Sequence, residues 1–282
     1  MTDNRTAASN YDEGVGVARD YYDSEEADSF YSAIWGGEDI HVGLYDGKTD
    51  IAVASRRTVD RMAGKLGDIS GKSVVDLGAG YGGAARVLAG EYGAHVTCIN
   101  LSSVENERNR ALTKEAGLGD RIKIVGGSFD NMIFDDSSFD IAWSQDAILH
   151  APDRLAVLDE VARVLKPGGE LIFTDPMQAD GLEDREALQP IYDRIHLPDL
   201  ASFGFYDEAL GKRGFEKIEV EKLTDQLGNH YARVREELAE RAAEEGIDAA
   251  FRDRMLAGLK HWVDGAAAGR LAWGIMHYRK RS

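Results

Sequence analysis

The sequence predicts a doubly wound α/β fold built on a mostly parallel sheet, and two patterns carry this prediction. Along the middle of the chain, short apolar runs rich in β-branched residues alternate with helix-forming stretches. A cluster of glycines follows the first apolar run, which is where a strand would turn tightly into a helix. Alternating strands and helices with short connections are typical of a parallel sheet that helices cover on both faces.

The predicted elements of this sheet follow in order from Lys72. The segment KSVVDLGAGYGGAARVLAGEYGAHVTCINLS should form a strand, a tight turn, a helix and a second strand. The second strand and the later elements are expected at 94–101 (strand), 104–116 (helix), 121–125 (strand), 139–144 (strand), 153–165 (helix) and 170–174 (strand). The last of these helices should stop at the KPGG that follows it, because proline and glycine are poor helix formers.

Three segments fall outside this alternation and are expected to cover the carboxyl ends of the strands. The first is a helical and aromatic N-terminal segment over 1–67, with the run FYSAIWGGEDIHVGLY at 30–45 and a helix at 50–66. The other two are insertions at about 177–214 and 225–268 in a main domain of 68–282. We therefore expect one core with appendages.

The second insertion lies between two further predicted strands, 215–223 and 271–279, and contains helical stretches at 230–244 and 249–263. Apolar residues recur on one face of the latter helix. They are Phe251, Met255, Leu259, Trp262 and Val263. We expect this face to pack on the sheet domain and not to touch a ligand.

The charge of the chain limits its partners. The 282 residues include 50 acidic and 33 basic ones, which gives a formal net charge of -17. This charge repels nucleic acid phosphates and anionic lipids, so we expect neither nucleic acid nor membrane as a partner. The acidity fits either good solubility or an organism with high internal salt. Residues 1–10 are polar and no run reaches about 18 apolar residues, so we expect a cytoplasmic protein.

The few metal-binding side chains predict no metal site. The single cysteine, Cys98, lies in an apolar run and excludes disulfides within the chain and Cys-rich zinc sites. His41, His230, His261 and His277 are scattered without the spacing of metal ligands. The sequence leaves the oligomeric state open.

The glycine turn is the strongest local signal for a ligand. In DLGAGYGG, which begins at Asp76, glycine lets the backbone approach a ligand closely, and the next helix offers free N–H groups. A glycine-rich turn alone would also suit a dinucleotide. Asp76 directly before the glycines would oppose a pyrophosphate and favour a bound cation or amino group. The amino acid part of S-adenosylmethionine fits this arrangement of charge better.

At this point the sequence resembles a known family. DLGAGYGG is similar to the first motif of class I S-adenosylmethionine-dependent methyltransferases, in which the second strand normally ends in Asp or Glu; Asn100 stands there in this chain. Together with FYSAIWGGEDIHVGLY, CINLS, WSQDAILHAPD, RVLKPGGELIFTDPM and RLAWGIMHYRK, it resembles the sarcosine/dimethylglycine N-methyltransferases that make glycine betaine. The resemblance implies a seven-stranded Rossmann-like methyltransferase sheet, S-adenosylmethionine as cofactor, no metal and a small amino acid acceptor.

The resemblance also implies positions for the cofactor. Asp76, Gly78 and Gly80 would line its methionine part, and Asn100 would hold its ribose. Ser128 and Phe129 would read the adenine, and Gln145 would lie under the cofactor. Trp35 and Arg57 would close over it, with Arg57 pairing the methionine carboxylate. A core position for Trp35 and a solvated helix charge for Arg57 are the alternatives.

The acceptor needs a grip on its carboxylate and an electron-rich surface near its nitrogen, which becomes permanently positive. Arginine supplies the first by a two-pronged contact, and aromatic faces supply the second. We assign the carboxylate to Arg194 and the developing ammonium to Tyr31, Tyr206 and Trp273. A surface salt bridge for Arg194 and a place in the sheet core for Trp273 are the alternatives.

Two polar residues follow the fourth strand, at the mouth of the expected site. His150 would accept the amine proton or orient the acceptor by a hydrogen bond. Asp146 would attract the cationic centre as well as cap the next helix. Methyl transfer needs little further acid–base chemistry, so positioning and electrostatics should dominate catalysis.

Three rival functions remain at the level of the sequence. A methyltransferase of glycine, phosphoethanolamine or another small acceptor would use the same fold. A non-catalytic S-adenosylmethionine-binding regulator would keep the cofactor site alone. A dinucleotide oxidoreductase is disfavoured by Asp76 and by the missing acidic residue at Asn100.

Overall fold

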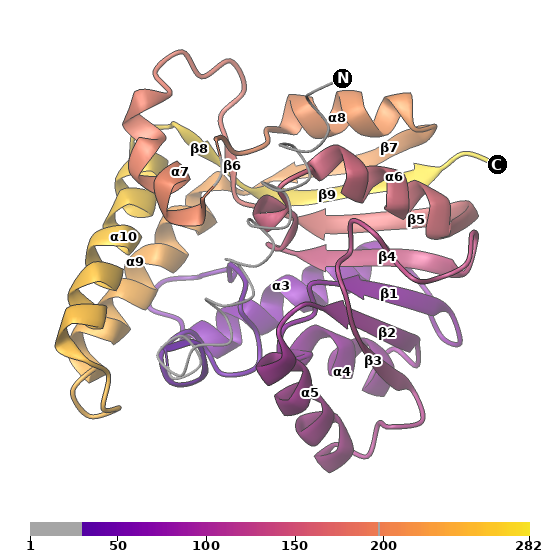
Figure 1. Cartoon of the computed structure of the whole chain (residues 1–282), viewed down its shortest axis with the longest axis horizontal. Coiled ribbons are helices and arrows are strands. Elements are labelled where there is room, and N and C mark those ends of the chain that lie inside the picture. Colours follow the sequence, from indigo (N-terminus) through magenta and orange to yellow (C-terminus); the bar gives the residue numbers. More distant parts are fainter. Residues whose placement is uncertain (1–29, 197) are drawn as a thin grey trace, which may run out of the picture.

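The central sheet has seven strands in the order β3-β2-β1-β4-β5-β9-β7 (Figure 1). The computed structural model describes residues 30–196 and 198–282, so the part of the predicted N-terminal segment before residue 30 lies outside the described residues. In chain order the strands are β1 (Ser73–Leu77), β2 (His95–Asn100), β3 (Ile122–Gly126), β4 (Phe139–Gln145), β5 (Leu165–Thr174), β7 (Phe215–Lys222) and β9 (Gly274–Lys280). β9 runs antiparallel to both its neighbours and the other pairs are parallel, which confirms the predicted mostly parallel sheet.

Helices cover both faces of this sheet because the strands bury alternate side chains on opposite sides. Val74 packs on one face with α3 (Ile51–Lys65) and α4 (Gly83–Gly90). Val75 packs on the other face with α6 (Arg154–Val164) and α8 (Phe203–Lys212). The remaining crossover helix, α5 (Ser103–Glu115), contacts β2 and β3. This is the doubly wound arrangement that the alternation of elements predicts.

A separate group of elements lies beyond the carboxyl ends of the parallel strands, at the left of Figure 1. It consists of α7 (Gln189–Ile195), α9 (Thr224–Arg241) and α10 (Ala249–Ala267), with the short helix η2 (Glu186–Leu188) and the two-stranded pair β6 (Met177–Gln178) and β8 (Leu271–Ala272). Together with residues 30–51 they bury an apolar cluster of their own. α8, which falls within the predicted insertion at 177–214, packs instead against β7 and α6.

Three element boundaries differ from the sequence-based expectation. β5 begins at Leu165, so KPGG lies inside the strand as an irregular stretch, where the pairing with β4 shifts register and Gly168 takes a φ of +76°. α9 begins at Thr224 and not at 230, so it includes Gly228. Glycine lowers helix propensity, but at this position α9 lies against Ala266 of α10. The predicted last strand is split at Trp273 into β8 and β9.

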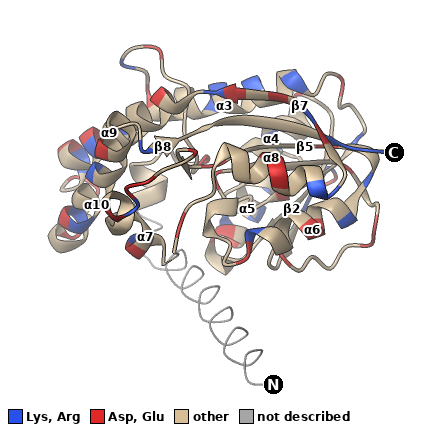
Figure 2. Cartoon of the chain, turned by 90° about the horizontal axis from the view of Figure 1, so that it is seen from above, with Lys and Arg blue, Asp and Glu red and all other residues tan. Residues whose placement is uncertain are grey.

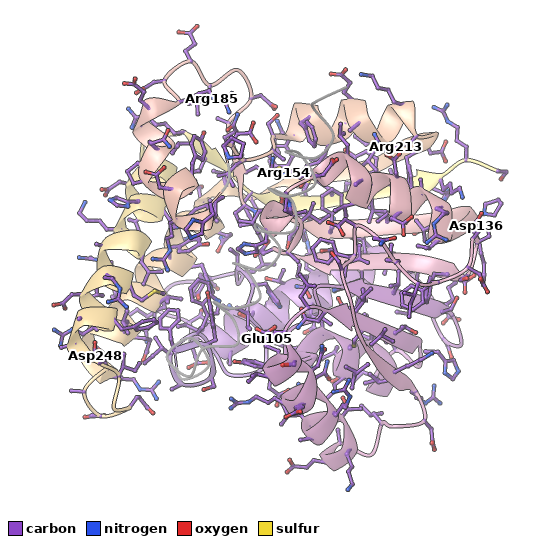
Figure 3. The ribbon with its side chains drawn as sticks, viewed as in Figure 1. Glu105, Asp136, Arg154, Arg185, Arg213 and Asp248 are labelled. Carbon is purple, nitrogen blue, oxygen red and sulfur yellow. The ribbon has the colours of Figure 1, made fainter. Side chains whose placement is uncertain are left out.

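Acidic and basic residues are interspersed along α9, α10 and the sheet helices (Figure 2). Arg154, at the start of α6, and Arg185, before η2, both pair with Asp199, at 2.7 Å and 3.1 Å. The two arginines are labelled in Figure 3. Within the described ranges, none of the helices has both the length and the apolar character that crossing a membrane requires.

Candidate active site

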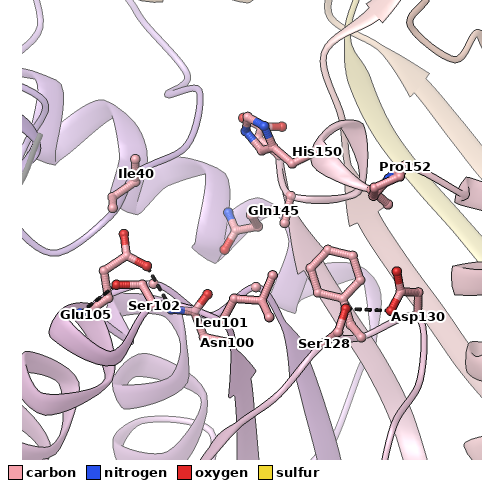
Figure 4. Close-up of a pocket in the computed structure, with 16 residues that line it drawn as sticks. Ile40, Asn100, Leu101, Ser102, Glu105, Ser128, Asp130, Gln145, His150 and Pro152 are labelled. Atoms are coloured by element: carbon pink, nitrogen blue, oxygen red, sulfur yellow. Dashed lines mark hydrogen bonds between the residues drawn. The ribbon is translucent and has the colours of Figure 1, made fainter. Parts of the chain in front are cut away.

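A first cavity lies at the carboxyl ends of β1, β2 and β4 (Figure 4). Its walls come from the glycine turn, the start of α5 and the segments after β3 and β4. The predicted site residues that line it are Gly78, Gly80, Asn100, Ser128, Phe129, Gln145, Asp146 and His150. The structure thus brings most of the predicted cofactor residues around one space.

Gly78 shows why the turn after β1 requires glycine. Its φ is +72°, and a Cβ at this position would lie 2.5 Å from the Cβ of Ala147, which also lines the first cavity. Because there is no side chain, the main chain of the turn itself forms part of the wall of the first cavity. A ligand in this cavity can therefore approach the backbone closely.

Asp76 lies behind the turn and does not appear among the described residues that line the first cavity. It is 3% exposed, and this burial raises its pKa to about 7, against the opposing charge of His41. The predicted contact of Asp76 with the methionine part of the cofactor is therefore not a wall contact in this structure.

The N-terminus of α4, where a dinucleotide site would hold its pyrophosphate, already carries a carboxylate. The carboxylate is that of Asp39, and a Cβ on Gly83, the first residue of α4, would lie 2.2 Å from Asp39 Oδ1. His41 Nε2 lies 3.6 Å from the same oxygen. Burial lowers the pKa of His41, but the hydrogen bond and charge of Asp39 outweigh burial and raise it. A phosphate at this helix end would meet Asp39, which argues against a dinucleotide.

The end of β2 carries a carboxylate that sequence reasoning missed. Asn100 Nδ2 donates a 2.7 Å hydrogen bond to Glu105 Oε2 (Figure 4). Glu105 lies in the first turn of α5, where its N–H donates to the capping Ser102 Oγ at 3.1 Å. The acidic group that the resemblance leads one to expect at position 100 is thus supplied five residues later. The pattern of serine followed three residues on by glutamate was the available signal.

A second missed carboxylate lies beyond β3. Ser128 Oγ donates to Asp130 Oδ1 at 2.5 Å, and both residues line the first cavity beside Phe129 (Figure 4). Asp130 is buried, at 8% exposure. Its oxygens can accept hydrogen bonds from an amino group on a flat ring placed against Phe129. A signal was present, since an aspartate two residues after Ser128 is a natural acceptor at a strand end.

Gln145 has a buried hydrogen-bond donor that a ligand in the first cavity could satisfy. Its Oε1 accepts a 3.0 Å hydrogen bond from Trp143 Nε1, whereas its Nε2 is buried and has no partner within the described part of the chain. A buried donor without a partner is costly unless a ligand or water completes it. The described walls of the first cavity contain Glu105, Asp130 and Asp146 and no lysine or arginine. These features fit a cationic ligand such as S-adenosylmethionine.

A second cavity lies between the end of β4 and the helices α7, α9 and α10. Ile40, Asp146 and His150 line both cavities, so the two spaces meet at these side chains. Its walls also contain Arg194 and four aromatic residues, Tyr31, Trp35, Tyr231 and Trp262. The structure therefore joins a cavity with acidic walls to one with aromatic walls.

The aromatic walls of the second cavity form a connected group. The rings of Tyr231 and Trp262 stack with centroids 4.9 Å apart and an interplanar angle of 4°. Trp35 lies 5.6 Å from Tyr231 and 5.4 Å from Tyr31. Its Nε1 is buried without a hydrogen-bond partner among the residues described. Trp35 thus lines the second cavity and not the first, whereas the sequence predicts it as a residue that closes over the cofactor.

Asp146 is fixed at the junction of the two cavities. It takes a positive φ of 52°, which is uncommon for a residue other than glycine and often marks a functional position. Its Oδ2 accepts from the N–H of Val42 at 2.7 Å and its Oδ1 accepts from Trp273 Nε1 at 2.8 Å. Burial raises the pKa of Asp146, while the hydrogen bond from Val42 and the charge of His41 oppose the rise.

His150 lies in the short helix η1 (Ile148–His150), directly after β4. Burial and the charge of Arg154 lower its pKa to about 4. At neutral pH the imidazole is therefore uncharged. The imidazole can hydrogen-bond a bound substrate without adding positive charge beside a positively charged cofactor.

Arg194, at the end of α7, lines the second cavity as predicted for the acceptor pocket. Its Nη2 lies 2.8 Å from Met255 Sδ. Across residues 30–196 and 198–282, no carboxylate lies within ion-pair distance of it. The alternative of a surface salt bridge is thus not seen, and the guanidinium is available for an anion.

Besides Asp76, three predicted site residues lie outside both cavities. Arg57 lies on the exposed face of α3, next to Thr49 and the carbonyl of Leu44, because the opposite face of that helix is buried. Tyr206 is fully buried in the sheet core and donates to Asp175 Oδ2 at 2.6 Å, so it cannot face an ammonium. Trp273 is also fully buried and reaches the site only through Asp146.

The apolar face of α10 corrects a further expectation. Leu259 and Trp262 line the second cavity, and the helix packs on α9 and α7 and not on the sheet. Tyr231 on α9 joins them. The helical spacing correctly indicates a buried face, but spacing alone does not say which surface that face meets.

Comparison with known proteins agrees with this geometry. Residues 75–173 match the family model described as a methyltransferase domain. The chain is 52% identical over 95% of its length to a glycine/sarcosine/dimethylglycine N-methyltransferase of Actinopolyspora halophila, of which it spans about half (48%). It is 51% identical to a sarcosine/dimethylglycine N-methyltransferase of Halorhodospira halochloris, covering 95% of this chain and 98% of that one.

A solved structure from Galdieria sulphuraria, a candidate sarcosine dimethylglycine methyltransferase, superposes with a TM-score of 0.86 at 43% identity. The match covers 92% of this chain and 99% of that one. With the glycine turn, the acidic first cavity and the aromatic second cavity in place, these similarities show that the chain belongs to the sarcosine/dimethylglycine N-methyltransferase family.

Proposed function

We propose that this chain is an S-adenosylmethionine-dependent N-methyltransferase that methylates sarcosine, N,N-dimethylglycine or both towards glycine betaine. The observation that carries the proposal is the meeting of two cavities of opposite character at Asp146 and His150. A cytoplasmic location and the absence of nucleic acid or membrane partners belong to the same proposal. The net charge of -17 supports them because it repels anionic surfaces.

The first cavity is the proposed donor site. When bound there, S-adenosylmethionine supplies an electrophilic methyl group on a positively charged sulfur. Asn100 and Glu105 would hold the ribose hydroxyls, and Ser128, Phe129 and Asp130 would surround the adenine. Gly78 and Gly80 let the main chain approach the methionine part, and Gln145 Nε2 would donate its unused hydrogen bond to it. We leave Arg57 out of this assignment because of its exposed position.

The second cavity is the proposed acceptor site. Arg194 would bind the acceptor carboxylate, since its guanidinium faces the cavity without a carboxylate partner in the described ranges. The acceptor nitrogen would then lie at the junction near Asp146, in line with the donor. Tyr31, Trp35, Tyr231 and Trp262 would surround the nitrogen as it becomes positive.

Within this arrangement the polar residues at the junction position the acceptor. Because the pKa of His150 is lowered to about 4, its imidazole does not take up a second proton at neutral pH. We therefore assign it the orientation of the amine and not the storage of the amine proton. Asp146, held by Val42 and Trp273, would stabilise the positive charge that moves from sulfur to nitrogen.

The single guanidinium favours a carboxylate over a phosphate as the acidic end of the acceptor. Among the described residues lining the second cavity, Arg194 is the only arginine, and none is a lysine. A phosphate dianion placed there would be opposed by Asp146 and neutralised by one cation only. This supports an amino acid acceptor over phosphoethanolamine.

The test is product analysis by mass. The protein is incubated with S-adenosylmethionine and, separately, with glycine, sarcosine, dimethylglycine and phosphoethanolamine, at low and high salt. We expect glycine betaine from dimethylglycine, with activity retained at high salt. A Gly78→Ala variant, whose new Cβ would collide with Ala147, is the negative control for donor binding.

Two results would contradict the proposal. Turnover of phosphoethanolamine but of none of the three amino acids would change the acceptor class. Tight binding of S-adenosylmethionine with no methylated product from any acceptor would indicate a regulator.

A further inference from the structure

The position of Arg194 depends on a glycine in the facing helix. α10 contains Gly258 in its buried interior, between Met255 and Leu259 on the same face. A Cβ on Gly258 would lie 2.4 Å from Arg194 Nη1, 2.9 Å from its Cζ and 3.2 Å from its Nε. All three of the nearest atoms thus belong to the guanidinium. The guanidinium of Arg194 therefore occupies the space beside α10 where a side chain at position 258 would be.

Glycine in the middle of a helix is unfavourable by about 1 kcal/mol relative to alanine, so its place in α10 needs a packing reason. The close approach of Arg194 supplies one. Met255, one turn earlier, places its sulfur 2.8 Å from Nη2 and so fixes the other edge of the same group. Leu259, next to Gly258, lines the second cavity together with Arg194.

From these contacts we infer that Gly258 is a positioning residue for the acceptor: it seats the guanidinium of Arg194 so that this group faces the second cavity and selects acceptors that carry a carboxylate. The inference rests on the proposed function. It adds that Gly258, a residue with no functional group of its own, helps to determine the class of substrate. A methyl group at 258 would displace Arg194, whose long side chain can move aside, without requiring the helix backbone to move.

The test is Gly258→Ala, with Gly228→Ala and Gly211→Ala as matched controls. Gly228 lies in α9 with its would-be Cβ 3.3 Å from Ala266, so it probes the packing of α9 on α10 away from Arg194. Gly211 lies in α8, where a Cβ would meet no atom within 4 Å. Each variant is assayed for steady-state kinetics with dimethylglycine, for binding of S-adenosylhomocysteine and for thermal unfolding.

Calorimetry then compares two ligands in the presence of S-adenosylhomocysteine: dimethylglycine and its primary amide, which keeps the shape and loses the negative charge. We expect Gly258→Ala to raise the KM for dimethylglycine about 10-fold or more and to reduce the preference for the acid over the amide by a similar factor. Binding of S-adenosylhomocysteine and the unfolding temperature should stay close to those of the controls.

The double variant Arg194→Met/Gly258→Ala separates the inference from the proposed function. If Gly258 acts through Arg194, alanine at 258 adds little once the guanidinium is gone. Independent, additive losses, or a Gly258→Ala variant that keeps its preference for the acid, would overturn the inference alone. An Arg194→Met variant that keeps this preference would instead remove the role proposed for Arg194.

Discussion

Trp273 Nε1 donates a 2.8 Å hydrogen bond to Asp146 Oδ1 across 127 positions of sequence. The other oxygen of Asp146 accepts from the N–H of Val42 at 2.7 Å. One carboxylate therefore ties the last strands and the N-terminal cover loop to the junction of the two cavities. Its position depends on both contacts, because a carboxylate held by two donors has little freedom to turn.

Replacing Trp273 by Phe removes the first of these donors and keeps most of the buried ring. We expect kcat/KM for dimethylglycine to fall about 10-fold, as for the loss of a hydrogen bond to a charged group. Trp143→Phe removes the comparable bond to Gln145 and should weaken donor binding instead. Steady-state kinetics and calorimetry with S-adenosylhomocysteine distinguish the two. The same pattern of loss in both variants would contradict a specific role for Trp273.

We expect Tyr206 to contribute to stability and Trp262 to contribute to acceptor binding, which is the reverse of what the sequence predicts. Tyr206→Phe removes the donor to Asp175 in the core, so we expect the free energy of unfolding to fall by about 1–3 kcal/mol, with little change in acceptor KM. Trp262→Leu should raise the acceptor KM about 5-fold by removing an aromatic face from the second cavity. Urea unfolding and kinetics measure the two effects. A raised KM in Tyr206→Phe with unchanged stability would argue against this reassignment.

His230 should make stability depend on pH. Its Nδ1 accepts from the N–H of Gly43 at 3.2 Å, and burial, followed by the charge of His41, lowers its pKa to about 3. In the unfolded chain this pKa returns to about 6.5, so the unfolded state binds the proton more tightly. The contribution of His230 is therefore complete above pH 6.5 and is lost as the pH falls towards 3.

The measurement is the free energy of unfolding in urea between pH 4 and pH 6.5. His230 alone should make it rise by up to about 1.4 kcal/mol per pH unit. His230→Asn keeps an acceptor for the N–H of Gly43 but has no group that titrates in this range. The free energy of unfolding of this variant should therefore rise less steeply with pH, by that amount. Asp76 and Asp175, whose pKa values burial raises to about 7, act in the opposite direction in both proteins and cancel in the comparison. Equal slopes would exclude His230 as the source.

Asn100 and Glu105 should behave as one unit in donor binding. Asn100→Asp gives position 100 the usual acidic residue, but it places a second carboxylate beside that of Glu105. The amide nitrogen that is replaced lies 2.7 Å from Glu105 Oε2. We expect S-adenosylmethionine to bind about 10-fold more weakly, and Glu105→Gln to have a similar effect. The double variant Asn100→Asp/Glu105→Gln should recover most of the affinity because it exchanges the two groups. Calorimetry measures this, and a gain in affinity from Asn100→Asp alone would refute the pairing.

The strands, the helices and the glycine turn depend on neighbours along the chain, and their positions can therefore be predicted from the sequence. Alternating apolar runs set the strands and helices, and DLGAGYGG set the turn in which Gly78 needs a positive φ. Since parallel strands end at one edge of the sheet, residues after β1, β2, β3 and β4 had to meet there. That is why Asn100, Ser128 and Gln145 line one cavity as predicted.

Which distant side chains complete that edge depends on how separate helices and strands pack. Tyr206 and Tyr231 are both aromatic residues in helices, yet one is in the sheet core and the other lines the second cavity. Their fate depends on how α8 and α9 pack, which is set by contacts between segments far apart in the sequence. The same holds for Trp273, which contacts Asp146, and for Gly258, which makes room for Arg194. Local spacing carries no record of such pairings, because they form only when separate helices and strands come together.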